Sequence, residues 1–488
     1  MHTNYKILVT LLYSACLLFT LNSKGQAVFN TSYQSGSRSA AYKITSIDQN
    51  DYLLTSYFND SLTGQQGLDL RKIDQQGNTI KRKRYLFKDL DFLSPGSNGF
   101  QLFLSGSTAI AIGGTGPTVI LASFNIVSLD TNWVKYYSDT TLGFRLSNIL
   151  RAKTNEYWLF GEAGNNVFGR PYVIKIDSTG NILSTLDITS LSQFSGRRAY
   201  FDTTLNLLFF TGENFSVPQT TPQAYVACID TSGNILWNKP FSSFFTQIEK
   251  KNTYLIVSGQ KWTKYQGGNN YYKLFLLKLN ASNGDIIWQK TYGEELIQNT
   301  FWACTINSDE SITSVGAYQY PSYNPIGLNT NGVILKTNTN GDSLWMHTYS
   351  NHGVGKVETF QDIQPTSDGG YIMCGAPHYA NPCHSWVVKT NSMGLGPGMY
   401  TVGLDEFQAQ EGLTVKVYPN PAKTDIRFDM EYGAMYEVLV FNTLGQMIMH
   451  LKDYENNTSV SVENLRSGLY TFIIRKEGKI HTGKFVKE

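Results

Sequence analysis

The sequence predicts an all-β protein made of repeated units, and two recurring features support that prediction. The first is a turn of the form Asp/Asn-x-x-Gly, which returns at intervals of roughly fifty residues along most of the chain. The second is a pair of aromatic residues four positions apart after the turn, as in Trp237/Phe241 and Trp345/Tyr349. A period of this size is typical of an array or a propeller in which each repeat is one supersecondary unit.

Each turn has the chemistry of a short β-hairpin. Asp or Asn at its first position accepts hydrogen bonds from the backbone that follows, and Gly three residues later tolerates a positive φ. An apolar strand precedes the turn, an aromatic strand follows it, and two further strands lie upstream, so each unit is expected to hold four strands. The turns begin at Asp74, Asp177, Asp230, Asn280, Asn338 and Asn391, the one at Asn280 is one residue longer, and a degenerate unit lies near Asp130.

We expect these units to form a seven-bladed β-propeller over residues 26–394. Near-continuous apolar runs indicate strands that are covered on both faces, as adjoining blades cover one another. The last turn is followed by Gly394–Gly398 instead of an aromatic strand, whereas Phe29–Tyr33 has the aromatic spacing without a strand before it. We therefore predict that the N-terminal strand completes the last blade, which removes exposed sheet edges. The recurrent Trp and Tyr residues are interpreted as packing between blades.

Residues 1–25 have the features of a signal peptide. Lys6 precedes an apolar stretch over residues 7–21, and Ser23 and Gly25 supply the small residues of a cleavage site before Gln26. An uncleaved membrane anchor and a lipoprotein attached at Cys16 are the alternatives. The stretch is short for a bilayer, and the apolar core continues beyond Cys16. No second apolar stretch of spanning length follows, so we expect no transmembrane segment in the mature chain.

Composition and motifs argue against several functions. The formal net charge is only +2, which disfavours nucleic acid as a partner. The basic run Lys81–Arg84 falls in an expected outer strand, where it is interpreted as a solvated edge. The sequence has no Gly-rich phosphate loop, His-Glu-x-x-His motif or nucleophile elbow, so we predict no cofactor and no enzymatic activity. A paired-carboxylate glycosidase stays open, because only geometry brings two carboxyl groups together.

The C-terminal segment, residues 413–488, lacks the repeat and has a different texture. Short alternating strands and Gly turns predict a small Ig-like β-sandwich. The Gly- and Pro-containing residues 395–412 are interpreted as a linker to it.

This segment resembles the type A C-terminal sorting domain of cargo proteins of the type IX secretion system of Bacteroidetes. Its opening Tyr-Pro-Asn-Pro, its Asn-Thr-Leu-Gly turn, its Leu-x-x-Gly-x-Tyr step and its Lys-Phe-Val-Lys ending follow the family's order. The resemblance implies the secretion machinery as a partner and a secreted or surface-attached product. An ordinary Ig-like accessory module is the alternative. The residues implied in sorting are Tyr418, Pro419, Asn420, Pro421, Gly445, Gly468, Tyr470, Lys484, Val486 and Lys487.

Export to an oxidising compartment raises the question of disulfides. Cys374 and Cys383 flank a short connection between two expected strands, and we predict a disulfide between them. The alternative is a metal site that adds His378 and His384, but this spacing matches no usual zinc signature, and no metal is predicted. Cys228 and Cys304 are interpreted as buried thiols.

Three connections rich in Tyr, Asn and Gly are expected on one face of the propeller, at residues 261–272, 317–331 and 376–384. Aromatic side chains there suit stacking on sugar rings or contact with a protein. We therefore predict a non-catalytic binding module for a glycan or protein ligand. The alternatives are a polysaccharide hydrolase or lyase, a structural adhesin, and solvated spacers without a ligand. The predicted ligand-binding residues are Trp262, Tyr265, Tyr271, Tyr272, Tyr318, Tyr320 and Tyr323.

Overall fold

The computed structural model describes residues 26–86, 101–115, 118–138, 143–164, 169–191, 194–214, 223–266, 269–296, 299–319, 330–351, 357–378, 383–401, 415–430, 435–442, 447–476 and 479–488. The predicted signal peptide and most of the predicted linker lie outside these residues. The chain divides into two compact units, residues 1–401 and 402–488. Within the described part, no helix is long and apolar enough to cross a bilayer.

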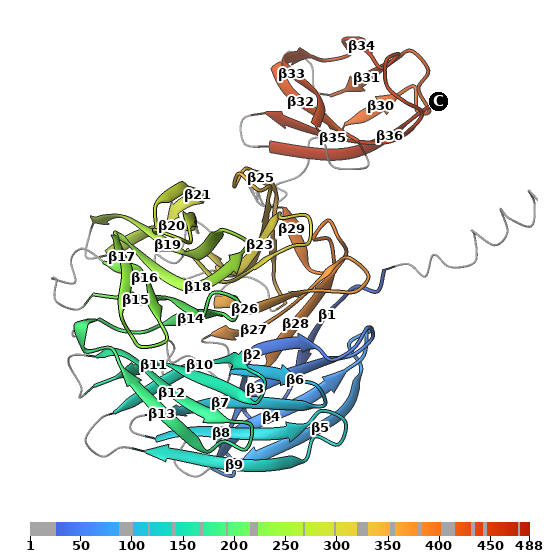
Figure 1. Ribbon diagram of the computed structural model, residues 1–488. Coiled ribbons are helices and arrows are strands. Elements are labelled where there is room, and N and C mark those ends of the chain that lie inside the picture. The colour runs from blue at the N-terminus through green and yellow to red at the C-terminus, as the bar shows by residue number, and fades with distance from the viewer. Residues whose placement is uncertain are drawn as a thin grey trace, which may run out of the picture. The chain divides into compact units, whose positions relative to one another are not determined.

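The N-terminal unit is all-β and propeller-like, as predicted. Groups of four consecutive strands form antiparallel sheets, here called blades, in which the strands pair in chain order (Figure 1). The 3-10 turn η1 (Thr189–Leu191) is the one helical element among the described residues. Five blades are separate sheets. The first two consist of β2 (Arg38–Ser46), β3 (Tyr52–Asp60), β4 (Gln65–Ile73) and β5 (Thr79–Leu86), and of β6 (Gln101–Ser105), β7 (Thr108–Thr115), β8 (Thr118–Asn125) and β9 (Thr131–Ser138). The other three consist of β10 (Phe144–Lys153), β11 (Glu156–Ala163), β12 (Arg170–Asp177) and β13 (Ile182–Asp187); of β14 (Arg198–Asp202), β15 (Leu207–Glu213), β16 (Ala224–Asp230) and β17 (Ile235–Phe241); and of β18 (Ser243–Lys251), β19 (Tyr254–Gln266), β20 (Asn269–Asn280) and β21 (Ile286–Leu296).

The remaining strands of this unit belong to one nine-stranded sheet that contains two such groups. A single parallel pair, Thr330 with Val357, joins the two groups. The N-terminal strand lies beside β28 and pairs with it from Phe29/Lys389 to Tyr33/Ser385. A short strand after the last turn pairs with the outer edge of β25. The strands are β22 (Thr300–Ile306), β23 (Ile312–Gln319), β24 (Thr330–Thr337), β25 (Ser343–Tyr349), β26 (Val357–Pro365), β27 (Tyr371–His378), β28 (Ser385–Thr390), β1 (Phe29–Tyr33) and β29 (Met399–Thr401).

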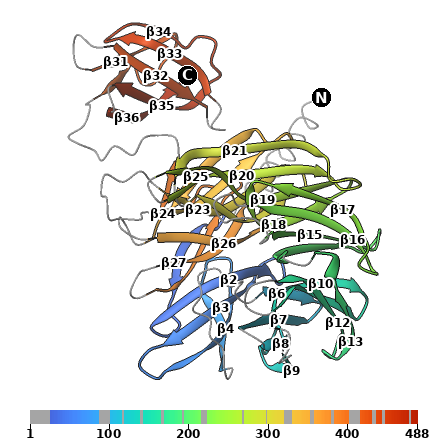
Figure 2. The ribbon, with the colours of Figure 1, turned by 90° about the vertical axis from the view of Figure 1, so that its left-hand side faces the viewer.

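Figure 2 shows the blades from a second direction. Apolar side chains fill the space between neighbouring blades. The third strands are the most completely covered: every side chain is buried from Ala224 to Ile229 in β16. One core cluster combines Val226 of β16 with Val257 and Phe275 of the following blade. Burial on both faces explains why these strands read as continuous apolar runs rather than as alternating ones.

The outer strands make a recurring contact, here called the rim contact, with the next blade's hairpin turn. A tryptophan of the outer strand lies against the turn glycine, where a Cβ would come within 2.5 to 3.0 Å of the ring at Gly180, Gly284, Gly341 and Gly394. A tyrosine hydroxyl four residues later donates to a turn carbonyl. These bonds run from Tyr33 to Gly77 (2.6 Å), Tyr137 to Gly180 (2.5 Å), Tyr292 to Gly341 (2.7 Å) and Tyr349 to Gly394 (2.6 Å).

The first strands of the blades, β2, β6, β10, β14, β18, β22 and β26, form what we call the inner wall. Each contacts the first strand of the following blade, and β26 contacts β2. Five of them, β2, β10, β18, β22 and β26, contain a register shift of the kind that a β-bulge produces. Bulges bend a strand and re-aim a side chain, and the shift in β18 falls at Thr246, between Phe245 and Gln247.

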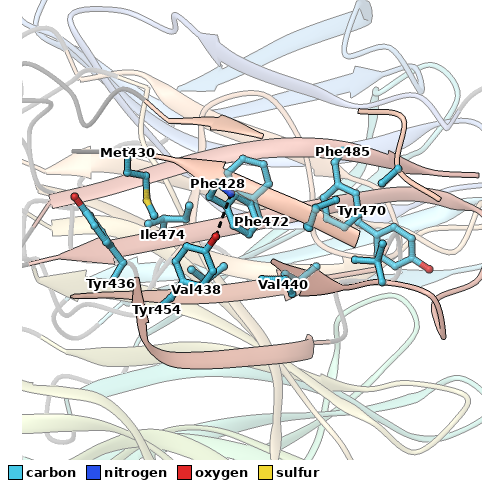
Figure 3. Close-up of a cluster of buried hydrophobic side chains, with 14 residues drawn as sticks. Phe428, Met430, Tyr436, Val438, Val440, Tyr454, Tyr470, Phe472, Ile474 and Phe485 are labelled. Atoms are coloured by element: carbon cyan, nitrogen blue, oxygen red, sulfur yellow. Dashed lines mark hydrogen bonds between the residues drawn. The ribbon is translucent and has the colours of Figure 1, made fainter. Parts of the chain in front are cut away.

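The C-terminal unit is a small all-β domain around one apolar core. Its core includes a T-shaped contact between Phe428 and Phe472, whose ring centroids are 4.8 Å apart. The backbone N–H of Phe428 donates to the hydroxyl of Tyr454 at 3.2 Å (Figure 3). Its sheets are β30 (Lys416–Tyr418), β31 (Asp425–Asp429) and β34 (Val460–Ser461), and β33 (Met447–Glu455), β32 (Met435–Phe441), β35 (Gly468–Lys476) and β36 (Lys479–Lys487), each given in pairing order.

Candidate functional site

The first predicted binding connection is a strand extension rather than a loop. In the blade β18–β21 the last three strands, β19, β20 and β21, have 13, 12 and 11 residues. The strands equivalent to β19 in two other blades, β7 and β11, have eight residues each. The extended part of β19 pairs with β20 as Trp262 with Tyr272, Lys264 with Tyr271 and Tyr265 with Asn270. Paired strands thus replace the expected loop over residues 261–266 and 269–272. Aromatic residues favour such strands.

Side-chain contacts hold this aromatic extension in place. The Nε1 of Trp262 donates to the Asn270 side-chain oxygen at 3.0 Å. The Nζ of Lys264 forms an ion pair with Glu295 at 2.6 Å and lies 5.0 Å from the centre of the Tyr271 ring. Lys264 belongs to β19 and Glu295 to β21, so their pair spans the strand that contains Tyr271. Because these contacts occur within one sheet, the aromatic rings are positioned before any ligand arrives.

Exposure distinguishes the predicted aromatic residues from one another. Tyr265 is 60% exposed, whereas Trp262, Tyr271 and Tyr272 are partly buried. The ring of Tyr272 makes an edge contact with Phe244, with centroids 5.9 Å apart. Tyr265 is therefore the most accessible stacking surface among the four.

Tyr318 does not belong to an accessible surface, which corrects its assignment to the site. It is only 4% exposed, and its hydroxyl accepts a hydrogen bond from the Glu294 N–H at 3.1 Å. A Cβ at Gly293 would lie 2.4 Å from its ring, so Tyr318 packs against β21 of the preceding blade. Burial also raises the pKa of this tyrosine. Tyr320 and Tyr323 lie outside the described residues.

The inner wall contains a second group of polar side chains, which the sequence analysis did not identify. The Asn148 side chain donates to the carbonyl of Arg197 at 2.8 Å, and the Nε of Arg198 donates to the carbonyl of Thr246 at 3.1 Å. The Thr246 hydroxyl in turn donates to the carbonyl of Phe301 at 2.5 Å. These bonds connect β10 with the residue that precedes β14, β14 with β18, and β18 with β22, each through a different residue type.

An ion pair makes the corresponding connection between β26 and β2. The carboxylate of Asp362 lies 2.8 Å from the Lys43 ammonium and accepts the Ile44 N–H at 3.0 Å. Burial raises the pKa of Asp362, and the charge of Lys43 opposes that shift. Enclosure in the wall likewise lowers the pKa of Arg198 to about 10.

Glu249 on β18 is another carboxyl group of this wall, and among the described residues it forms no ion pair. Its Oε1 accepts a hydrogen bond from the Gln247 amide at 2.8 Å. Desolvation raises its pKa, while the Gln247 hydrogen bond and the charge of Lys43 act in the opposite direction. The charge of Asp362 also raises the pKa of Glu249. A desolvated carboxyl group of this kind occurs in catalytic sites and in structural polar networks. The sequence signal that could have found it is an acidic residue in an otherwise alternating first strand.

The predicted disulfide between Cys374 and Cys383 is absent, because both residues are free cysteines. In the ladder of β27 and β28, Cys374 lies opposite Val387, four residues from Cys383. At about 3.3 Å per residue this separates the two by about 13 Å along the strand, whereas a disulfide needs Cα atoms within about 7 Å. The Cys383 thiol instead donates to the Ser39 carbonyl at 3.3 Å. Cys228 and Cys304 are buried thiols.

The alternative metal site gains no support where it can be described. No group of three or more His, Cys, Asp or Glu side chains converges as metal ligands within the described ranges. The side chain of His378 lies outside them.

In the C-terminal domain, the opening and closing sorting motifs lie side by side. The Asn420 side chain accepts the Val486 N–H at 2.9 Å, and the Ala422 N–H donates to the Val486 carbonyl at 2.7 Å. The Glu488 N–H in turn donates a hydrogen bond to the Ala422 carbonyl at 2.9 Å. Two segments that are more than sixty residues apart in sequence therefore form one edge of the domain. Gly445 lies outside the described residues.

Comparisons with known proteins find one family model and several solved structures that are similar to parts of this chain. Residues 416–488 match the family model of the secretion system C-terminal sorting domain. No curated protein matches the chain. Solved structures with similar folds include BamB from Moraxella catarrhalis, with 11% identity and a TM-score of 0.37 over 74% of this chain and 100% of that one. The Neurospora crassa Pan2 WD40 domain has 13% identity and a TM-score of 0.41 over 75% of this chain and 96% of that one. The β-propeller domain of the Trilobed protease from Pyrococcus furiosus has 8% identity and a TM-score of 0.40 over 74% of this chain and 97% of that one.

The propeller-like unit and the matched sorting domain define the class of this protein: an exported β-propeller protein with a C-terminal address. It is type IX secretion cargo with a type A sorting domain at residues 416–488, and it is secreted or attached at the cell surface.

Proposed function

We propose that the N-terminal unit is a non-catalytic binding module, a seven-bladed propeller whose β19–β21 extension binds a glycan chain. The observation that supports this proposal is the aromatic extension itself. Trp262, Tyr265 and Tyr271 belong to paired strands and are held by hydrogen bonds and an ion pair. A preorganised aromatic surface loses little conformational entropy when a sugar ring stacks on it.

Strand pairing supports the blade count within this proposal. Five separate four-stranded sheets and two further groups in the nine-stranded sheet make seven blades, with β1 as the outer strand of the last. The contact of β26 with β2 and the bond from Tyr33 to Gly77 join the last blade to the first. The C-terminal domain is proposed to be an Ig-like sandwich, since a three-stranded and a four-stranded sheet share one core.

Glycan-array binding by the full mature chain tests the ligand proposal. The variant Tyr265→Ala is expected to weaken capture about tenfold, as loss of an exposed aromatic anchor does. Tyr136→Ala is the matched control, because Tyr136 is 54% exposed on β9, in a different blade. Equal binding by wild type and Tyr265→Ala would contradict the assignment of this surface. Failure to bind any glycan would favour a protein ligand instead.

One observation favours a second candidate, a secreted polysaccharide hydrolase or lyase. Burial raises the pKa of both Glu249 and Asp362, and the charge of Asp362 contributes to the shift at Glu249. Two carboxyl groups with unequal environments can divide acid and base roles. Product analysis of each bound polysaccharide tests this alternative. Shortened chains that disappear in Glu249→Gln would replace the binding proposal by the enzymatic one, whereas intact ligand would exclude it.

A further inference from the structure

The C-terminal domain separates the sorting motifs into inward and outward side chains. Within the four-stranded sheet, Leu469 pairs with Val486, Tyr470 with Phe485 and Thr471 with Lys484. The Leu-x-x-Gly-x-Tyr step and the Lys-Phe-Val-Lys ending are therefore neighbours on adjacent strands. Since side chains alternate across a sheet, adjacent pairs point to opposite faces.

Folding explains the inward residues of both motifs. The rings of Tyr470 and Phe485 stack with centroids 5.4 Å apart, and both residues are buried. The Tyr470 hydroxyl donates to the carbonyl of Arg466 at 2.7 Å. A Cβ at Gly483 would lie 2.3 Å from the ring of Phe472, so glycine leaves room for that core aromatic. These residues belong to the core shown in Figure 3.

Folding does not explain the outward residues. Leu469 is 43% exposed and Val486 is 39% exposed. They face each other across the two strands, so together they make one apolar surface. Lys484 is exposed two residues from Val486 and therefore on the same face. A sheet needs no aliphatic pair on its solvated face, where threonine would pair as well.

We propose that Leu469 and Val486, flanked by Lys484, are the surface that the type IX secretion machinery recognises. The partner site expected from this chemistry is an apolar depression with an acidic rim, which a central aliphatic contact and a peripheral cation would fit. The inward residues of the same motifs then serve to fold the domain. This inference rests on the sorting role of the domain and is independent of the ligand proposed for the propeller.

Secretion of the full chain from its native host tests this surface. Leu469→Thr/Val486→Thr keeps residues that favour strands but removes the apolar contact. We expect the secreted fraction to fall about tenfold, the size of effect typical of a small interface hot spot. The retained protein is expected to be folded, as judged by resistance to trypsin. Ile448→Thr is the matched control, since Ile448 is 36% exposed on β33, the opposite edge strand of the same sheet.

Each outcome decides between recognition and folding. Retention of a trypsin-resistant double variant, with normal secretion of Ile448→Thr and of Tyr470→Phe, supports the proposal. Normal secretion of the double variant overturns it. Retention of a trypsin-sensitive double variant also overturns it, because the pair would then act through folding. None of these results depends on whether the propeller binds a glycan.

Discussion

At the rim of the propeller, neighbouring blades meet through the same types of residue at successive junctions. At the inner wall, the junctions β10–β14, β14–β18, β18–β22 and β26–β2 each use a different pair of groups. Rim contacts place an aromatic ring on a turn glycine and a tyrosine hydroxyl on a turn carbonyl. Inner-wall contacts use an amide, a guanidinium, a hydroxyl and an ion pair in turn. The difference indicates that the repeated sequence motif determines the rim contacts, whereas the inner-wall contacts depend on the particular residues of each pair of neighbouring strands.

The largest effect is expected from breaking a rim contact. Trp237→Ala should lower the free energy of unfolding by about 3 to 5 kcal/mol, as removal of a buried tryptophan does. Trp237 is 8% exposed, and its Nε1 donates to the Ala281 carbonyl at 3.1 Å. Urea denaturation measures the change. The adjacent Leu236 is 53% exposed, so Leu236→Ala should stay within about 0.5 kcal/mol of wild type; an equal loss in both variants would contradict the rim assignment.

Breaking the inner wall should cost somewhat less. Lys43→Met leaves the Asp362 carboxylate, whose side chain is 7% exposed, without its cation. We expect a loss of about 3 kcal/mol at neutral pH, the lower end for an uncompensated buried charge. The loss should shrink as the pH falls, since protonation of Asp362 removes the unpaired charge. Arg170→Met, which breaks the more exposed pair with Asp187, is the control and should cost at most about 1 kcal/mol.

A smaller effect is expected from removing one rim hydrogen bond. The bond between the last and first blades can be compared with the equivalent bond between two consecutive blades. Tyr33→Phe removes the bond to the Gly77 carbonyl and should cost about 1 kcal/mol in urea denaturation. Tyr292→Phe removes the equivalent bond to Gly341 and should cost the same. The chain already tolerates phenylalanine at the corresponding position, Phe241. A much larger loss at Tyr33 would show that the N-terminal strand is held chiefly by this one bond.

The smallest effect concerns pH and Glu249. A carboxyl group with a raised pKa in the folded state binds protons there more readily than in the unfolded chain, so stability falls as the pH rises above the unfolded value near 4.5. Glu249→Gln removes this loss while keeping an acceptor for Gln247. The variant should be more stable than wild type at pH 7, with the difference closing toward pH 4. An unchanged difference between pH 4 and pH 7 would show that Glu249 is solvated in the folded state.

Sequence reasoning succeeded where local spacing determines structure. The Asp/Asn-x-x-Gly turns, the aromatic pairs and the place of Phe29–Tyr33 beside the last repeat follow from patterns within a few residues. The sorting domain was recognised from motifs in a fixed order and is confirmed by the family match. The repeated turns and aromatic pairs can be predicted from the sequence because they recur at one interval along the chain.

Tertiary structure decided the rest. The sequence placed Cys374 and Cys383 near one connection, but the strand register separates them, so they form no disulfide. It placed Tyr318 in a binding loop, but the neighbouring blade covers that ring. The Asp362–Lys43 pair joins residues 319 positions apart, and the Leu469–Val486 surface depends on which strands pair. Chain spacing by itself determined the repeating unit and the export route, whereas contacts between distant segments required the folded backbone to bring them together.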